Sequence, residues 1–299
     1  MSRDPIDVPD IVKRTALDHE HGAEWLAGID DLVAGLARDW DLTIGEVFSG
    51  GTASVVIAVT TASGEAAVLK VAPDDLTTEA NTFELANGRG CARMLRHDLS
   101  RGALLLERLG RQLDALGLST DDNLRAIAAT VQQMWAPVPD GTELTMGDDK
   151  GRWLSDSITE LWEALERPCN ERTIDRARAY AATRVAAFDR ERAVLVHGDA
   201  HQWNTLESGA GDGTYKLVDP DGLCAEREYD LAIPIREVIG TPAQGRLWCH
   251  LLANVTGTDA TAIWEWGLVE RVSTGLLSTK HGIQPDAARM LAVADAWSL

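Results

Sequence analysis

Hydrophobic side chains recur along this chain with two different periods, and each period predicts a different kind of element. Apolar positions from Trp25 to Trp40 return every three or four residues, which predicts an amphipathic helix. The runs 42–48, 53–60 and 65–71 are rich in β-forming residues and are separated by Gly and Ser, which predicts an antiparallel meander. The first part of the chain is therefore expected to be a helix followed by a β-sheet.

The helical period returns at 77–87, a second hairpin is predicted over 94–97 and 103–109, and beyond it the β-pattern almost disappears. Further helices are predicted around 119–137, 153–165, 174–188, 231–239, 243–254, 260–277 and 287–294, interrupted by one hairpin with its turn at 209–213. The pattern predicts an α+β fold with two lobes. Residues 1–109 are expected to form an antiparallel β-sheet lobe with a leading helix, and residues 110–299 a mainly helical lobe.

Composition narrows the partners of this 299-residue chain. A net charge of −19 disfavours nucleic acid and anionic membranes as partners. It fits either a cationic substrate or the general solubility of a strongly acidic proteome. The four cysteines form no C-x-x-C pair, and no run approaches the ~18 apolar residues of a membrane span. With no signal-peptide pattern at the N-terminus, we expect a cytoplasmic protein, monomeric or weakly dimeric.

The residues best suited to chemistry follow two apolar runs. The run 193–196 leads into a His-Gly-Asp loop in which Asn204 comes five residues after Asp199, and the run 215–218 leads to Asp219. Two carboxylates and an amide at the ends of neighbouring strands can bind Mg²⁺ and position a hydroxyl group, as phosphoryl transfer requires. The Asp-x-x-x-x-Asn spacing also matches the catalytic loop of kinases.

Two features of the β-rich part point to phosphate binding. The turn at Gly50 and Gly51 lets backbone N–H groups approach phosphate oxygens, although such turns also occur in ordinary hairpins. Lys70 lies in an apolar strand, where its ammonium group needs a partner unless it faces solvent on an edge strand. Glu79 in the following helix is the expected partner, with Glu84 as the alternative.

The strand 103–109 leads into Gly110 and suits a connector between the two lobes. Its last residues, Glu107 to Leu109, are expected to offer backbone groups to an adenine ring. The alternative is an ordinary buried strand, because no residue type there marks an adenine site.

Three motifs taken together resemble the aminoglycoside phosphotransferases, a superfamily with a protein-kinase-like fold. They are His197-Gly-Asp-Ala-His-Gln-Trp-Asn204, Asp219-Pro-Asp-Gly222 and Tyr229-Asp-Leu-Ala232, and they are most similar to the streptomycin and hydroxyurea phosphotransferase branch. The resemblance implies that Asp199 is the catalytic base. It further implies that Asn204 and Asp219 bind Mg²⁺, and that Lys70 with Glu79 clamps the nucleotide phosphates.

The resemblance also implies supporting roles around the loop. His197 is expected to brace the loop, and Asp230 to cap it by accepting backbone N–H bonds. Asp221 departs from the Asp-Phe-Gly pattern of protein kinases and is assigned to the metal neighbourhood, with a substrate contact or a turn as alternatives. His201 is interpreted as an exposed loop residue rather than as a proton shuttle or ligand.

The implied function is Mg²⁺-dependent transfer of a phosphoryl group from ATP, or alternatively GTP, to a hydroxyl of a small cationic molecule. An aminoglycoside such as streptomycin is the leading acceptor, which would make the protein an antibiotic resistance enzyme. Alternatives are a kinase for a sugar, hydroxyurea or another small metabolite, and a pseudokinase-like binding module. Acidic candidates for the substrate contacts, most of them expected on a solvated helix face, are Asp156, Glu160, Glu163, Glu265 and Glu270.

Overall fold

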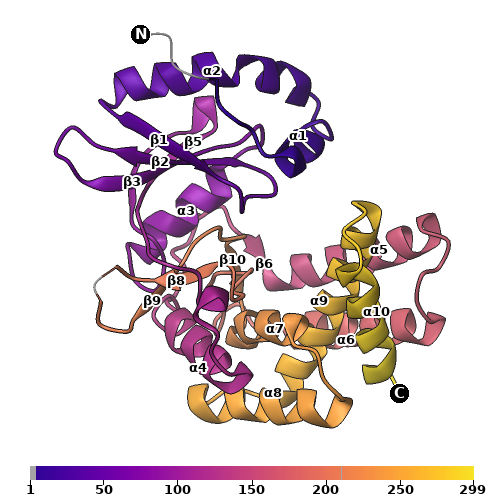
Figure 1. The fold of residues 1–299 in the computed structure, drawn as a ribbon. Coiled ribbons are helices and arrows are strands. Elements are labelled where there is room, and N and C mark those ends of the chain that lie inside the picture. Colours follow the sequence, from indigo (N-terminus) through magenta and orange to yellow (C-terminus); the bar gives the residue numbers. More distant parts are fainter. Residues whose placement is uncertain (1–4, 210) are drawn as a thin grey trace. The chain divides into compact units, whose positions relative to one another are not determined.

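The computed structural model describes residues 5–209 and 211–299; residues 1–4 and Ala210, which belongs to the predicted turn 209–213, lie outside the described residues. The chain divides into two compact units (Figure 1). The first comprises the chain up to Gly88 together with Ala92–Leu109, and the second comprises Arg89–Cys91 with Gly110–Leu299. The predicted α+β class is confirmed. None of the described helices combines the length and the apolar character that crossing a membrane requires.

The first unit is built on a five-stranded antiparallel sheet. In spatial order its strands are β1 (Thr43–Phe48), β2 (Val55–Thr60), β3 (Ala66–Val71), β5 (Ala103–Glu107) and β4 (Met94–Asp98). The central strand β3 pairs with β2 on one side and with β5 on the other. The predicted meander and second hairpin are therefore both present.

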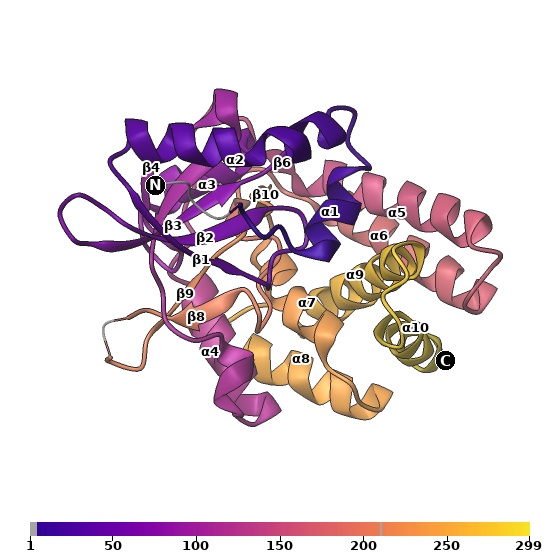
Figure 2. The same cartoon turned by 45° about the horizontal axis from the view of Figure 1, so that its top comes forward.

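Three α-helices accompany this sheet, α1 (Asp10–Ala16), α2 (Gly22–Asp39) and α3 (Thr77–Ala86), and the 3₁₀ turn η1 (Leu99–Arg101) lies between β4 and β5. Both views of the ribbon show α2 lying along one face of the sheet (Figures 1 and 2). Val33 and Leu36 of α2 are fully buried in one cluster with Ile57 and Leu69 of the strands. Helix α1 was not predicted, because seven residues are too few to show a helical period.

The second unit is mainly helical. Its helices are the 3₁₀ turn η2 (Leu113–Leu116), α4 (Thr120–Val131), α5 (Gly147–Ala164), α6 (Glu171–Ala187), α7 (Arg227–Glu237), α8 (Pro242–Thr256), α9 (Ala260–Lys280) and α10 (Asp286–Trp297). Helix α9 packs against α5, α6, α7, α8 and α10, and Figure 2 shows it between α7 and α10. A helix that is buried on nearly every side in this way forms the centre of its unit.

Two helix starts differ from the prediction for the same reason. Helix α5 begins at Gly147 rather than at Trp153, and α7 begins at Arg227 rather than at Leu231. Both added first turns carry acidic residues, which stabilise the positive end of a helix dipole but add nothing to a hydrophobic period. The predicted helix around 119–137 is present as α4, and its N-cap is Ser119, whose side chain accepts the N–H of Asp122.

The second unit also contains five short strands, and loops of this unit connect them. One sheet has the order β6 (Thr145–Met146), β10 (Leu223–Ala225), β7 (Val194–Val196), and a separate hairpin pairs β8 (Thr205–Glu207) with β9 (Tyr215–Leu217). The prediction placed the strands before Asp199 and Asp219 side by side, which is wrong, because β7 pairs with β10 and β9 pairs with β8. Strands of three residues carry too little pattern to specify a partner. The loop that contains Asp199 therefore connects the two sheets.

Candidate active site

The backbone of the loop between β7 and β8 is held by a carboxylate from α7. Asp230, which is fully buried, accepts the N–H groups of His197 at 3.1 Å and Gly198 at 2.9 Å. It also accepts the indole N–H of Trp135 at 3.0 Å. Burial raises the pKa of Asp230 to about 6, against the effect of these three donors. The loop cap assigned to Asp230 thus has the expected geometry.

His197 links the loop to the segment that carries the second acid. Its fully buried ring has Nε2 3.0 Å from the carbonyl oxygen of Val218, while Nδ1 lies 3.2 Å from the backbone nitrogen of Asp199. This arrangement fits a neutral ring that donates from Nε2 and accepts at Nδ1. Burial lowers the pKa of His197 to about 4. The N–H of Gly222 donates to the His197 carbonyl at 3.0 Å, so the histidine holds two segments together.

Asp199 has partners on both carboxylate oxygens. Oδ1 accepts from the Arg236 guanidinium at 2.8 Å, and Oδ2 accepts from the Asn204 amide at 3.1 Å. His201 Nε2 lies 3.2 Å from Oδ2, so the prediction of an exposed His201 is wrong: its side chain is 14% exposed. Burial alone would raise the pKa of Asp199, but the charge of Arg236, aided by His201, outweighs burial and holds that pKa well below its usual range.

Arg236 is a site residue that the sequence prediction missed. It is the penultimate residue of α7, and its side chain is 9% exposed. Besides Asp199, its guanidinium contacts Glu237 at 2.6 Å and Glu270 at 3.6 Å. The signal was available, because Arg236 ends the apolar run that starts at Leu231, and the same argument identified Lys70.

The two acids after β9 differ in their surroundings. Both are exposed, but Asp219 adopts a left-handed backbone with φ of 62°, whereas Asp221 forms an ion pair with Lys150 of α5 at 3.1 Å. Burial disfavours the charge on Lys150, but Asp221 and Glu270 outweigh it and raise the pKa of the ammonium group. Within residues 5–209 and 211–299, no three His, Cys, Asp or Glu side chains form a metal-binding group. The donors fit Mg²⁺ all the same, since Mg²⁺ is usually bound by one or two protein groups plus phosphates and water.

In the first unit, the predicted lysine and glutamate are in contact. Lys70 Nζ lies 2.6 Å from Oε2 of Glu79, and both side chains are buried. Lys70 stands on the central strand, so the edge-strand alternative is wrong. Glu84 lies 3.5 Å from His97 instead, at the surface. The contact predicted between Lys70 and Glu79 is therefore present.

The remaining predicted nucleotide residues also lie in the first unit. Gly50 and Gly51 form the turn between β1 and β2, and a Cβ on Gly51 would lie 2.6 Å from the Ser54 carbonyl oxygen, so this position requires glycine. Glu107 ends β5, and its carboxylate accepts the backbone N–H of Arg93 at 2.7 Å. Leu109 is buried.

The acidic candidates for substrate contacts divide into two groups. Asp156, Glu160 and Glu163 are exposed, as a solvated helix face requires. Glu265 and Glu270 of α9 are buried, so most of the candidates, but not these two, lie on a solvated face as expected. Glu265 pairs with Arg184 at 2.7 Å, and Glu270 accepts the phenol hydroxyl of Tyr229. Among these candidates, only Glu270 thus joins the charge cluster around Asp199, through Arg236.

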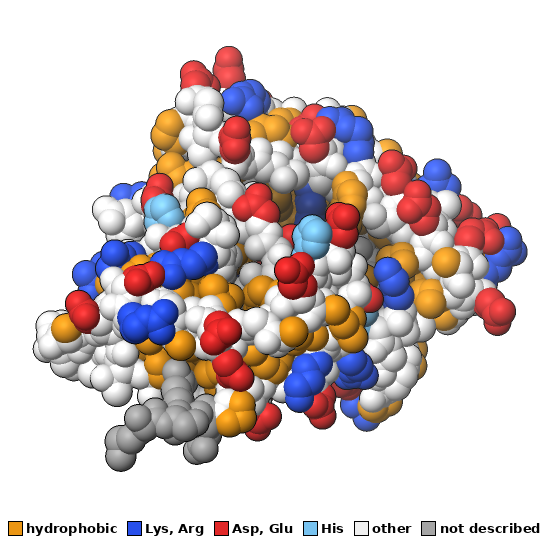
Figure 3. All heavy atoms as spheres, turned by 90° about the horizontal axis from the view of Figure 1, so that it is seen from above, with side chains coloured by type: hydrophobic (Ala, Val, Ile, Leu, Met, Phe, Trp, Pro, Cys, Tyr) orange, Lys and Arg blue, Asp and Glu red, His pale blue; other side chains and the backbone are white. Residues whose placement is uncertain are grey.

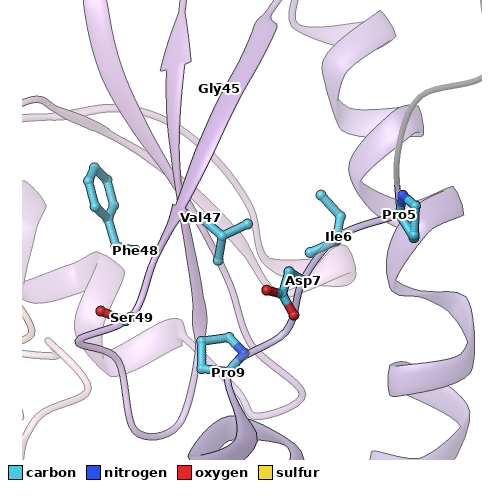
Figure 4. A pocket seen from close by; sticks show the side chains of 8 residues that line it. All are labelled: Pro5, Ile6, Asp7, Pro9, Gly45, Val47, Phe48 and Ser49. Atoms are coloured by element: carbon cyan, nitrogen blue, oxygen red, sulfur yellow. The ribbon is translucent and has the colours of Figure 1, made fainter.

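Other surface features lie apart from these residues. A cavity of about 480 Å³ lies between the N-terminal segment and β1, where Figure 4 shows Ile6 and Pro9 facing Val47. None of the predicted site residues lines it. On the face seen in Figure 3, acidic side chains are spread among Lys and Arg rather than gathered in one patch. The net charge of −19 therefore does not by itself mark a binding surface on that face.

Comparison with known proteins is consistent with this geometry. Residues 39–244 match the family described as aminoglycoside/hydroxyurea antibiotic resistance kinases. The chain is 31% identical to a streptomycin 6-kinase of Streptomyces glaucescens, over 71% of this chain and 68% of that protein. It is 30% identical to a hydroxyurea phosphotransferase of Kitasatospora aureofaciens, over 92% of this chain and 80% of that protein. A thermostable mutant of an aminoglycoside phosphotransferase, solved with ADP and hygromycin B, aligns with a TM-score of 0.63 at 15% identity, covering 89% of this chain and 97% of that one.

The fold is therefore that of the kinase-like phosphotransferases. The chain belongs to the aminoglycoside/hydroxyurea antibiotic resistance kinases, as the resemblance of its three motifs predicted. It is a small-molecule kinase, a phosphotransferase that acts on a hydroxyl group. Membership of a kinase family also implies an ATP-type nucleotide as the phosphoryl donor.

Proposed function

We propose that the protein transfers the γ-phosphate of ATP to a hydroxyl group of a small cationic acceptor, and that a streptomycin-like aminoglycoside is this acceptor. The observation that carries the proposal is Asp199, an ionised carboxylate whose two oxygens are fixed by Arg236 and Asn204. A carboxylate in this state can orient the acceptor hydroxyl and accept its proton.

In the proposed reaction, the acceptor oxygen bonds to the γ-phosphorus while the bond from that phosphorus to the β–γ bridging oxygen breaks. ADP leaves, and the hydroxyl proton passes to Asp199. The protein contributes mainly position and charge to such a transfer. Lys70, whose ammonium group pairs with Glu79, is proposed to bind the nucleotide phosphates, aided by backbone N–H groups of the turn at Gly50 and Gly51. The backbone from Glu107 to Leu109 is proposed to contact the adenine ring.

Mg²⁺ would neutralise charge on the phosphate oxygens when bound. Asn204 and Asp219 are the proposed ligands. The NH₂ group of Asn204 donates to Asp199, which leaves its carbonyl oxygen as the metal donor. Asp221, whose carboxylate pairs with the ammonium group of Lys150, is the third proposed ligand.

The charges around Asp199 favour a cationic acceptor. Four carboxylates lie among three cations there: Arg236 pairs with Asp199, Glu237 and Glu270, Lys150 pairs with Asp221, and the charge of Arg271 interacts with Glu237. The excess of negative charge attracts ammonium or guanidinium groups. Hydroxyurea, which the Kitasatospora relative's name specifies, is neutral and gains nothing from this field. It is the second candidate acceptor, on the strength of that relative.

The test is a phosphate-transfer screen with radiolabelled ATP and Mg²⁺ over streptomycin, other aminoglycosides, hydroxyurea and neutral sugars. We expect transfer to a streptomycin-like compound, with product formation abolished by Asp199→Ala. That variant should bind the nucleotide almost as tightly as wild type, because Asp199 acts on the acceptor. A loss of nucleotide affinity as large as the loss of turnover would contradict the role of Asp199, and transfer to hydroxyurea alone would favour the second candidate.

A further inference from the structure

Arg236 is a buried cation that contacts several carboxylates around the catalytic loop. Its guanidinium is buried and bridges three carboxylates from three places: Asp199 on the loop, Glu237 next to it in the chain, and Glu270 on α9. Burial disfavours the charge of Arg236, but Asp199 and Glu237 outweigh it and raise its pKa well above the usual value. The group is therefore a permanent cation, in contact with the carboxylate proposed to orient the acceptor.

The position of this guanidinium is fixed from the core of the unit. Arg271 of α9 donates to the carbonyl oxygens of Ile235 and Val238, each at 2.6 Å, and so caps the end of the helix that carries Arg236. The neighbouring residue on α9, Glu270, is held in turn by the hydroxyl of Tyr229. The end of α7 that carries Arg236 is thus held by contacts from α9, in addition to the contacts of Asp230 with the loop.

Within the loop, Asp199 has side-chain partners for only one of its two carboxylate oxygens. Asn204 and His201 both contact Oδ2, and both belong to the same short loop as Asp199. Oδ1 is contacted by Arg236, which comes from a helix 37 residues further along the chain. Without this contact, the carboxylate could rotate about its side-chain bonds while keeping one loop partner.

We propose that Arg236 is a positioning residue, which fixes the rotation of the Asp199 carboxylate so that one oxygen faces the acceptor hydroxyl. This inference rests on the proposed function insofar as Asp199 is taken as the group that orients the acceptor. Arg236 acts through Asp199 and contacts neither the nucleotide nor the acceptor. Its loss should therefore lower kcat while leaving both KM values nearly unchanged.

The first experiment compares Arg236→Lys and Arg236→Ala with wild type and with the control Arg178→Met. Arg178 is exposed on α6, and its replacement removes the same charge far from the loop. We expect kcat to fall about 100-fold in Arg236→Ala, since a misplacement of about 1 Å has an effect of this order. Arg236→Lys should keep an intermediate rate, and guanidinium ion below denaturing concentrations should restore part of the rate of Arg236→Ala only.

Two results would overturn the proposal. One is a rise of the acceptor KM at unchanged kcat, which would make Arg236 a substrate contact. The other is equal turnover in Arg236→Lys and wild type together with no guanidinium rescue. If wild type phosphorylated none of the acceptors, the proposed function would fail, and the second experiment would still test the ion pair.

That second experiment is a double-mutant cycle on stability and needs no turnover. The urea midpoints of wild type, Arg236→Lys, Asp199→Asn and the double variant are compared. Because the two side chains are in contact, the shift caused by Arg236→Lys should be smaller in the Asp199→Asn background. Equal shifts in both backgrounds would show that Arg236 does not act on Asp199, whatever the acceptor.

Discussion

The buried ring of His197 leads to a prediction about how the stability of the protein depends on pH. The ring donates to Val218 and accepts from Asp199, and the contact with Asp199 requires the neutral form, because a protonated ring has no acceptor nitrogen. We consider His197→Gln, because glutamine supplies one donor and one acceptor but does not titrate. The variant should lose some stability at neutral pH and, more tellingly, part of the pH dependence of wild type.

The size of the effect follows from the lowered pKa. Burial brings the pKa of His197 from 6.5 to about 4. Above pH 6.5 the ring is neutral in both the folded and the unfolded protein, and its full contribution to stability is present. As the pH falls from 6.5 towards 4, the unfolded chain binds a proton that the folded protein does not, so stability is lost. One pKa unit corresponds to about 1.4 kcal/mol, which gives a loss of about 2 kcal/mol at pH 5 and about 3 kcal/mol near pH 4.

Urea titrations at pH 7.5 and pH 5 measure this loss. Asp230, with its pKa raised to about 6, acts in the opposite direction: its folded form binds a proton first, so it adds stability as the pH falls. Both wild type and His197→Gln retain Asp230, so the contribution of Asp230 to the pH dependence cancels when the two proteins are compared. The control is His250→Gln, a change of an exposed histidine on α8.

Between pH 7.5 and pH 5, wild type should lose about 2 kcal/mol more unfolding free energy than His197→Gln, and the same as His250→Gln. An equal loss in wild type and His197→Gln would refute the reasoning, because the ring would then not be held neutral by the fold. If His250→Gln lost less unfolding free energy than wild type over this pH range, then His250 would contribute to the pH dependence assigned to His197.

Three further substitutions test other parts of the structure. Glu79→Gln removes the carboxylate that pairs with the buried ammonium group of Lys70 and should lower the unfolding free energy by about 3 kcal/mol, as measured by urea titration. Gly198→Ala places a Cβ 2.8 Å from that of Asp221 at φ of 87°, so it should destabilise the protein by about 1–3 kcal/mol and lower kcat, which paired stability and rate measurements would show. Thr241→Ala removes the capping box of α8 and should cost about 1 kcal/mol of stability with turnover unchanged, and a change in kcat would contradict a purely structural cap.

The parts of the site that the sequence predicted depend on local chemistry. Lys70 was recognised because an ammonium group in an apolar strand needs a partner, and the predicted Glu79 contacts it nine residues later. Asp199 and Asn204 were recognised by their spacing within one loop, and the structure brings their side chains into contact. In both cases the partners lie close together in the chain, so a pattern of a few residues carries the information.

The parts that the sequence did not predict depend on distant pairings. Arg236 reaches Asp199 across 37 residues, and Lys150 reaches Asp221 across 71 residues. Such contacts are set by the packing of α5, α7 and α9, which a single sequence does not specify. The same applies to β7, because three apolar residues fit equally well beside several other strands.

The cap of the loop by Asp230 has a consequence for the order in which the molecule forms. Asp230 lies 33 and 32 residues beyond the two N–H groups that it accepts, and the intervening segment contains both β8 and β9. During synthesis, the loop therefore remains without its anchor until α7 has emerged and docked. Contacts over such sequence separations form late and slowly. We therefore expect chains interrupted before α7 to contain a folded first unit while lacking an ordered catalytic loop.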